Sequence, residues 1–155
     1  MNEASPDEKG IGQSLEAEIM AVVFRRLEAI KNKDESAVRA IMDERYNKFD
    51  DWPPFKRQEA EEALKSEFGA FKVLSNYTYE LKDTKTIVFG DVAVTTSIMQ
   101  YRGEIRNSPF AISSRVTFVL NKSDVGWKFV HEHYSRFQGE QPNDQPRTSK
   151  RRFPW

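Results

Sequence analysis

The chain has 155 residues, of which 24 are Lys or Arg and 24 are Asp or Glu, so its formal net charge at pH 7 is zero. This length suits one domain, and the balanced charge argues against nucleic acid or an anionic membrane surface as partners. The chain contains no cysteine, which excludes disulfides, thiol nucleophiles and thiolate metal sites and fits a reducing, cytoplasmic location.

The first segment, residues 1–13, is polar and lacks apolar periodicity, so we expect it to be disordered. It has no apolar core of a secretory signal, and no run in the chain reaches the roughly 18 apolar residues of a membrane span. Helical spacing then predicts an amphipathic helix over about 14–32, with Ser14 as its N-cap. Its apolar positions are Leu15, Ile19, Val22, Val23, Leu27 and Ile30.

Two further helices are predicted on either side of an aromatic loop. Asp34 should cap a short second helix, and the third should start near Lys56. The segment 45–55 between them contains the consecutive prolines Pro53 and Pro54, which forbid a helix. The expected buried positions of these helices are Val38, Ile41, Met42, Leu64, Phe68 and Phe71.

After Lys72 the apolar pattern alternates, which is typical of strands. Helices followed by hairpin-linked strands predict an α+β domain with an antiparallel sheet. The segment 139–155 contains three prolines and the basic cluster 150–152, so we expect a disordered tail; the alternative is a docking tail. The expected strands are around 77–81, 87–89, 92–101, 110–120 and 127–137.

The last strand carries a resemblance to a known family. The run GWKFVHEHYS at residues 126–135 resembles the ending of SnoaL-like domains of the nuclear-transport-factor-2-like superfamily, and that of the association domain of calcium/calmodulin-dependent protein kinase. The preceding strand, SRVTF at 114–118, fits the same pattern, and the resemblance covers a domain over 14–138. It implies a curved antiparallel sheet wrapped by about three N-terminal helices, a cone-shaped, cystatin-like roll with a concave pocket and a convex face that pairs with another copy.

The resemblance also implies which residues line that pocket. Matched to the kinase association domain, the three pocket arginines are replaced here by Ser97, Phe118 and Tyr134, so the pocket is not built to hold a carboxylate in arginine forks. A β-bulge would reverse part of the assignment, and ordinary core packing is the alternative for the apolar and tyrosine positions. The pocket positions expected from strand alternation and loop placement are Tyr46, Trp52, Thr95, Ser97, Met99, Tyr101, Phe118, Glu132 and Tyr134.

Four residues are candidates for acid–base chemistry. Glu132 lies between apolar and aromatic neighbours on a strand, so it is either solvated or paired with an arginine or lysine, or it lies in a cavity with a raised pKa. Tyr134 would be a hydrogen-bond donor beside it. Asp50 and Asp51, in the aromatic loop, are the alternative bases.

His131 and His133, the only histidines, share one strand face and lie about 7 Å apart by strand rise. We expect them on the convex dimer face, where protonation near pH 6.5 would loosen the pairing. No metal-binding spacing, phosphate loop, dinucleotide fingerprint or G-x-S-x-G motif is present, so we expect no metal and no cofactor.

Three functions remain open. The first, which the sequence favours, is a homodimeric protein that binds a small molecule. The second is an isomerase, hydratase or cyclase that uses a pocket carboxylate and a tyrosine. The third is an oligomerisation or scaffold module, which predicts a filled cone rather than an open pocket.

Overall fold

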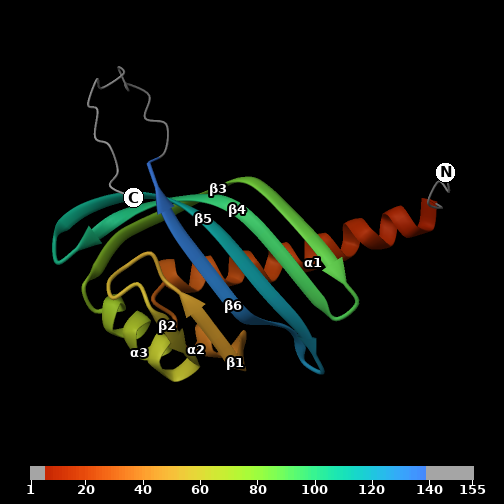
Figure 1. Ribbon diagram of the computed structural model, residues 1–155, viewed down its shortest axis with the longest axis horizontal. Coiled ribbons are helices and arrows are strands. Elements are labelled where there is room, and N and C mark those ends of the chain that lie inside the picture. The colour runs from red at the N-terminus through yellow and green to blue at the C-terminus, as the bar shows by residue number, and fades with distance from the viewer. Residues whose placement is uncertain (1–5, 139–155) are drawn as a thin grey trace, which may run out of the picture.

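The computed structural model describes the backbone of residues 6–138 and the side chains of residues 14–138 (Figure 1). A curved sheet of strands β3 to β6 arches over the long helix α1, and the shorter elements gather at one end (Figure 1). The elements in chain order are α1 Pro6–Lys31, α2 Glu35–Ala40, β1 Met42–Phe49, β2 Arg57–Glu59, α3 Ala60–Phe71, β3 Leu74–Phe89, β4 Val92–Ile105, β5 Ser108–Ser123 and β6 Gly126–Phe137.

The sheet has six strands in the order β2-β1-β6-β5-β4-β3. Successive strands from β3 to β6 pair antiparallel through hairpins, as the alternating segments predicted, although the expected segments 77–81 and 87–89 form one strand, β3. The predicted α+β class with a curved sheet is confirmed, but the sheet also has one parallel pair, β1 with β6, that no local pattern indicated. Helix α1 covers the concave face and buries Ile19, Val22, Val23 and Leu27.

The N-terminal helix is longer than predicted. It begins at Pro6, so the prediction of Ser14 as N-cap is wrong, because Ser14 lies inside the helix. Proline at the first helical position and acidic residues in the first turn are a helix-start pattern that does not require apolar periodicity. Residues 1–5 and the predicted tail over 139–155 lie outside the described residues.

The segment predicted as an aromatic loop is partly a strand. Tyr46 and Phe49 belong to β1, and Met42, expected on the second helix, opens that strand. The two prolines lie in the short loop between β1 and β2, and the Pro53–Pro54 bond is cis. The third helix begins at Ala60 rather than near Lys56 because the short strand β2 precedes it.

A β-bulge in β6 changes which of its side chains face inward. The register of β6 on β5 shifts so that Leu120 opposes Phe129 while the adjacent Val119 opposes His131, leaving Val130 as the extra residue. Strict alternation from Trp127 would place Phe129, His131 and His133 on one face, and the bulge separates the two histidines from that face. The inward residues are Trp127, Phe129, Glu132 and Tyr134, while His131 and His133 face outward.

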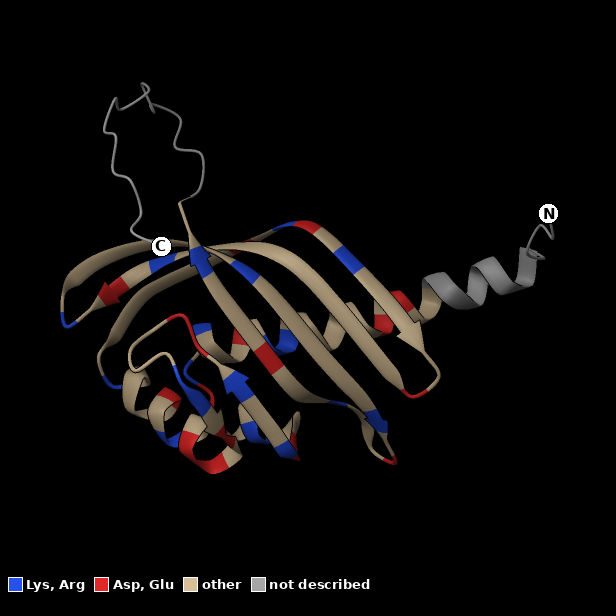
Figure 2. Ribbon diagram, in the orientation of Figure 1, with Lys and Arg blue, Asp and Glu red and all other residues tan. Residues whose placement is uncertain are grey.

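Charges are distributed over the whole described surface. Figure 2 shows basic and acidic positions interspersed on the helices and hairpins, with long uncharged stretches on β4 and β5. No face of one sign appears in this view, which agrees with the balanced composition. Within residues 6–138 no helix is long and apolar enough to cross a membrane.

Candidate functional site

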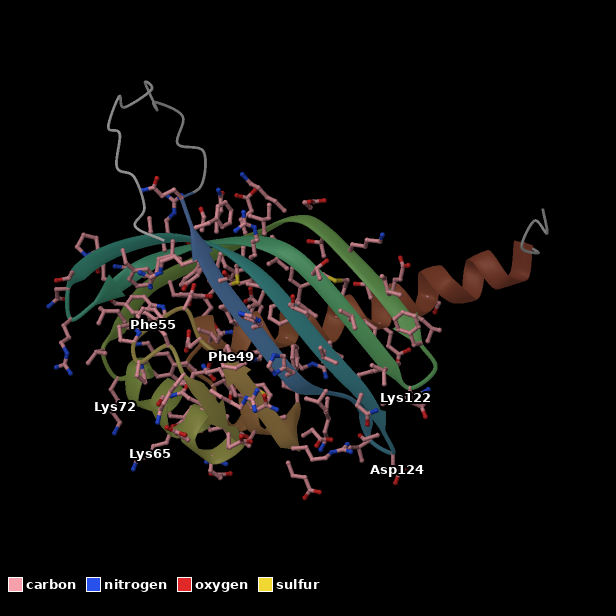
Figure 3. All side chains as sticks on the ribbon, in the orientation of Figure 1. Phe49, Phe55, Lys65, Lys72, Lys122 and Asp124 are labelled. Atoms are coloured by element: carbon pink, nitrogen blue, oxygen red, sulfur yellow. The ribbon has the colours of Figure 1, made fainter. Side chains whose placement is uncertain are left out.

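A cavity of about 330 Å³ lies between the concave face of the sheet, helix α3 and the loop that follows β1. Phe55, with 61% of its surface exposed, lies at its mouth. Figure 3 shows Phe55 in this loop beside α3, while Lys65 and Lys72 extend from the region of α3 into solvent. Apolar lining comes from Ile30, Ala70, Phe71, Val73, Leu74, Met99 and Ile105.

Four aromatic side chains form a continuous row along one wall of the cavity, here called the aromatic row: Trp52, Phe110, Tyr101 and Tyr77. Trp52 meets Phe110 edge to face with ring centroids 5.4 Å apart, and Phe110 meets Tyr101 at 5.9 Å. Tyr101 and Tyr77 are 6.2 Å apart. Such contacts fix ring orientations as well as bury area, so the wall is held in one shape.

Beneath the row lies a buried ion cluster centred on Arg26 of α1. Its Nε donates to Glu132 Oε1 at 2.9 Å, and its Nη1 and Nη2 donate to the two carboxylate oxygens of Glu67 at 2.9 and 2.8 Å. Tyr46 donates to Glu132 Oε2 at 2.8 Å. Burial acts to raise the pKa of Glu132, but Arg26, Lys48 and Tyr46 outweigh it and hold that pKa below its usual range.

A second ion pair lies nearer the loop. Lys48 of β1 is 6% exposed, and its Nζ lies 3.0 Å from Asp50 Oδ2. Burial acts to raise the pKa of Asp50, but attraction to Lys48 and hydrogen bonds with Lys48 and Asp51 lower it overall. Asp50 therefore stays ionised and neutralises Lys48.

Asp51 is the one buried lining carboxylate without a cationic partner among the described side chains. Tyr101 donates to its carboxylate at 2.9 Å and Ser114 donates to Oδ2 at 2.8 Å. Trp52 Nε1 in turn donates to the Tyr101 hydroxyl at 3.1 Å. Burial raises the pKa of Asp51, and neighbouring Asp50 raises it further against the two hydroxyl hydrogen bonds.

Three polar groups of the lining have no hydrogen-bond partner among the described residues. The hydroxyls of Tyr77 and Tyr134 make no such bond, and Tyr77 is 9% exposed. Burial raises the pKa of both phenols, so both are neutral at pH 7. Gln58, 5% exposed, donates its amide to Ser66, but its carbonyl oxygen Oε1 is buried and unpartnered.

The predicted pocket residues divide into two groups. Trp52, Met99, Tyr101, Glu132 and Tyr134 line the cavity, as do the candidate bases Asp50 and Asp51. The other four are not in the lining. Tyr46 and Phe118 are fully packed behind it, while Thr95 and Ser97 bond to Thr86 and Thr84 of β3.

The sequence prediction missed the charged cavity residues Arg26, Lys48 and Glu67, and it also missed Tyr77 and Phe110 of the aromatic row. Arg26 occupies a position on the apolar stripe of α1, three residues after Val23 and next to Leu27, and that irregularity was the available signal. Lys48 and Glu67 read as ordinary surface charges. Across the described residues, no group of three His, Cys, Asp or Glu side chains could hold a metal ion.

The outer, convex face carries the two histidines. Val94, Val119 and His131 lie opposite one another on β4, β5 and β6, and this cross-strand row is only partly exposed. His131 Nδ1 lies 2.9 Å from Asn47 Oδ1, and Phe49 packs against both histidine rings. Burial and the neighbouring His133 lower the pKa of His131.

Comparison with known proteins gives a family match and several similar structures. The family model of the SnoaL-like domain matches residues 19–138, while no curated protein sequence matches significantly. An NTF2-like superfamily protein from Salmonella enterica serovar Typhimurium is 19% identical with a TM-score of 0.74, covering 86% of this chain and 99% of that one. The CaMKII hub of S. rosetta is 23% identical with a TM-score of 0.67, covering 78% and 95%. A ketosteroid isomerase-like protein from Erwinia carotovora atroseptica is 20% identical with a TM-score of 0.66, covering 79% and 96%.

Proposed function

The chain belongs to the SnoaL-like domain family of the NTF2-like superfamily, and on that premise we propose that it binds a small organic molecule in its concave cavity. The observation that carries the proposal is the cavity itself: about 330 Å³, walled by the aromatic row and floored by ordered polar groups. Ligand sites are typically of this size, mostly apolar and furnished with a few fixed polar groups. The cavity supports this proposal over a pure scaffold module, for which a filled cone is expected.

The test is native mass spectrometry of the protein purified from its own host, repeated after mild denaturation. A small mass that stays on the native protein and leaves on unfolding is the expected result. Val73→Trp places a large ring in the lining and should prevent retention, whereas Val125→Trp, in the β5–β6 hairpin at 81% exposure, should not. Retention that is unaffected by Val73→Trp would place the ligand elsewhere.

An acid–base enzyme is the second candidate, favoured by Asp51. This carboxylate faces the cavity, carries a raised pKa and is linked to Tyr101, which makes it a better base than Glu132, whose oxygens are held by Arg26 and Tyr46. Proton abstraction beside a carbonyl exchanges that hydrogen with solvent. Deuterium uptake by a panel of ketones in heavy water, followed by NMR, should therefore occur with the wild type and be lost in Asp51→Asn.

We further propose that two copies pair through the outer face, around the row of Val94, Val119 and His131. Partly exposed apolar side chains in the middle of a sheet favour burial against another surface. The similarity to a CaMKII hub supports the fold only, so the number of copies is left to measurement by sedimentation. A monomer at micromolar concentration would contradict the pairing.

A further inference from the structure

The charges that line the cavity do not balance. Apart from Lys56 at the rim, which pairs with Glu62 at 2.8 Å, the cationic lining residues are Arg26 and Lys48. The acidic lining residues are Asp50, Asp51, Glu67 and Glu132. Arg26 pairs with the carboxylates of Glu67 and Glu132, and Lys48 pairs with Asp50. Asp51 therefore accepts hydrogen bonds from hydroxyl groups only. The cavity interior is therefore acidic although the chain as a whole is neutral.

The hydrogen-bond inventory has the same bias. The guanidinium of Arg26, the indole N–H of Trp52 and the hydroxyls of Tyr101 and Ser114 all donate to protein acceptors. The donors left over among the described lining side chains include the hydroxyls of Tyr77 and Tyr134, which can accept as well as donate. Acceptor capacity is left over on Asp51, on the unpartnered Gln58 Oε1, and on the phenol oxygens of Tyr77 and Tyr134. A ligand that donates hydrogen bonds would satisfy groups that are otherwise unpaired.

The aromatic row provides ring faces that attract a cation. Aromatic faces attract cations within about 6 Å of the ring centre, most strongly for tryptophan. Trp52 already shows this, since the guanidinium carbon of Arg136 lies 5.0 Å from its ring centre. Tyr101 belongs to the row and also donates to Asp51, so an aromatic wall and a carboxylate meet at one place in the cavity.

We propose that the cavity binds an organic cation, a protonated amine on a flat apolar body, with the ammonium group received by Asp51 and the body seated along the aromatic row. The inference rests on the proposed ligand-binding function and adds the charge class of the ligand. An anionic ligand would face the uncompensated carboxylate, and a neutral apolar ligand would leave the acceptors unpaired.

The test compares three probes of similar shape: 2-phenylethylammonium, 2-phenylethanol and 3-phenylpropionate. Binding to the full chain is measured by ligand-observed NMR and isothermal titration calorimetry at pH 7. We expect the ammonium to bind at least tenfold more tightly than the alcohol, and the carboxylate not to bind. Equal or tighter binding of the alcohol or the carboxylate would overturn the inference while leaving a ligand-binding cavity.

Variants locate the charge recognition. Asp51→Asn should remove the preference for the ammonium over the alcohol, and Asp124→Asn, in the β5–β6 hairpin far from Phe55 (Figure 3), should retain it. If Asp51→Asn does not fold, Tyr101→Phe, which leaves the carboxylate and frees the oxygens that the Tyr101 hydroxyl occupies, should increase the preference for the ammonium; an unchanged preference in whichever variant is folded overturns the assignment to Asp51. If no probe binds while a ligand is retained in native mass spectrometry, the cation inference is wrong and the binding function stands. If neither is seen, both are wrong.

Discussion

Arg26 and Glu132 lie 106 residues apart in the sequence and form a fully buried ion pair, with Nε 2.9 Å from Oε1. The pair joins α1 to β6 beneath the cavity, and Glu67 of α3 completes it on the other side of the guanidinium. Three elements that come together only in the folded chain therefore meet at one side chain. The floor of the cavity and the packing of α1 on the sheet depend on the same contact.

Removing the guanidinium of Arg26 should lower the stability of the fold. Arg26→Met leaves Glu132 buried without its cation, and we expect the free energy of unfolding to fall by about 3–5 kcal/mol in urea titrations. Arg26→Lys keeps the positive charge but loses the two-pronged guanidinium contact, so its free energy of unfolding should fall by less than that of Arg26→Met. The control is Arg39→Met, whose exposed pair with Glu61 is expected to contribute no more than about 1 kcal/mol. Similar losses in the two methionine variants would contradict the role of the buried cluster.

The raised pKa of Asp51 predicts a pH dependence of stability. The folded state holds this proton more tightly than the unfolded state, so Asp51 lowers stability as the pH rises from the ordinary Asp value of 3.8 through its folded pKa. The groups that act on this carboxyl are Asp50, Tyr101 and Ser114. The free energy of unfolding of the wild type minus that of Asp51→Asn should therefore fall across this window. A constant difference would show that folding does not shift the Asp51 pKa.

Two glycine-to-alanine substitutions should have opposite effects. A Cβ at Gly103 of β4 would lie 3.0 Å from the Ser75 carbonyl oxygen and 3.1 Å from the Phe110 ring, so Gly103→Ala should destabilise by about 1–3 kcal/mol and displace Phe110 from the aromatic row. At Gly69 in α3 the position that a Cβ would occupy has nothing within 4 Å, so Gly69→Ala should stabilise by about 0.5–1 kcal/mol. Thermal unfolding of both variants, with weaker ligand retention only in the first, checks this.

A charge on the outer face should separate the proposed dimer. Val119→Lys places an ammonium at the centre of the row with Val94 and His131, where a pairing surface would have to bury it unpaired. Sedimentation should then give half the wild-type mass with an unchanged far-ultraviolet spectrum. Lys122→Glu changes a charge at the exposed end of the same strand (Figure 3) and should leave the mass unaltered. Loss of pairing in both variants would indicate that the interface extends to the β5–β6 hairpin.

Acid should weaken the same face. Folding lowers the pKa of His131, so the unfolded chain takes up this proton first and the His131 contribution to stability is lost as the pH falls below about 6.5. His133, Asn47 and Phe49 surround the ring, and a positive charge on His131 at this face opposes pairing. The sedimentation mass should drop between pH 8 and pH 5.5. An unchanged sedimentation mass over this pH range would contradict the placement of the histidines in the interface.

The sequence predicted what is encoded locally. Apolar periodicity located the long helix and the hairpin strands, and the terminal GWKFVHEHYS run indicated the family that the family model confirms. Periodicity missed β1, because the inward residues of that strand are Tyr46 and Lys48 and its sequence shows no apolar alternation. Lys48 is inside only because Asp50 and neighbouring carboxylates compensate it, which is a tertiary property.

The cavity lining was predicted only in part, because local sequence patterns do not show tertiary contacts. Alternation along β4 is regular, so Met99 and Tyr101 were placed correctly in the lining, but alternation does not tell how far a covering helix extends. Thr95 and Ser97 share that strand face and are nevertheless buried outside the cavity. The pairing of Glu132 with an arginine was one of two alternatives, and only the fold shows that the arginine is Arg26.

The extra residue at Val130 makes the local register of β6, as well as side-chain identity, a determinant of what the protein can recognise. With the bulge, one strand supplies core aromatics at its start and cavity groups at its end from the same face. If β6 alternated regularly from Phe129 with Val130 kept in the ladder, Glu132 and Tyr134 would turn outward and His131 and His133 would face the cavity, whereas deleting Val130 would remove the extra residue and leave Glu132 and Tyr134 inward. Whether this cavity has an acidic or an imidazole wall therefore depends on the bulge as well as on residue types, a dependence that comparisons of aligned residue types would not reveal.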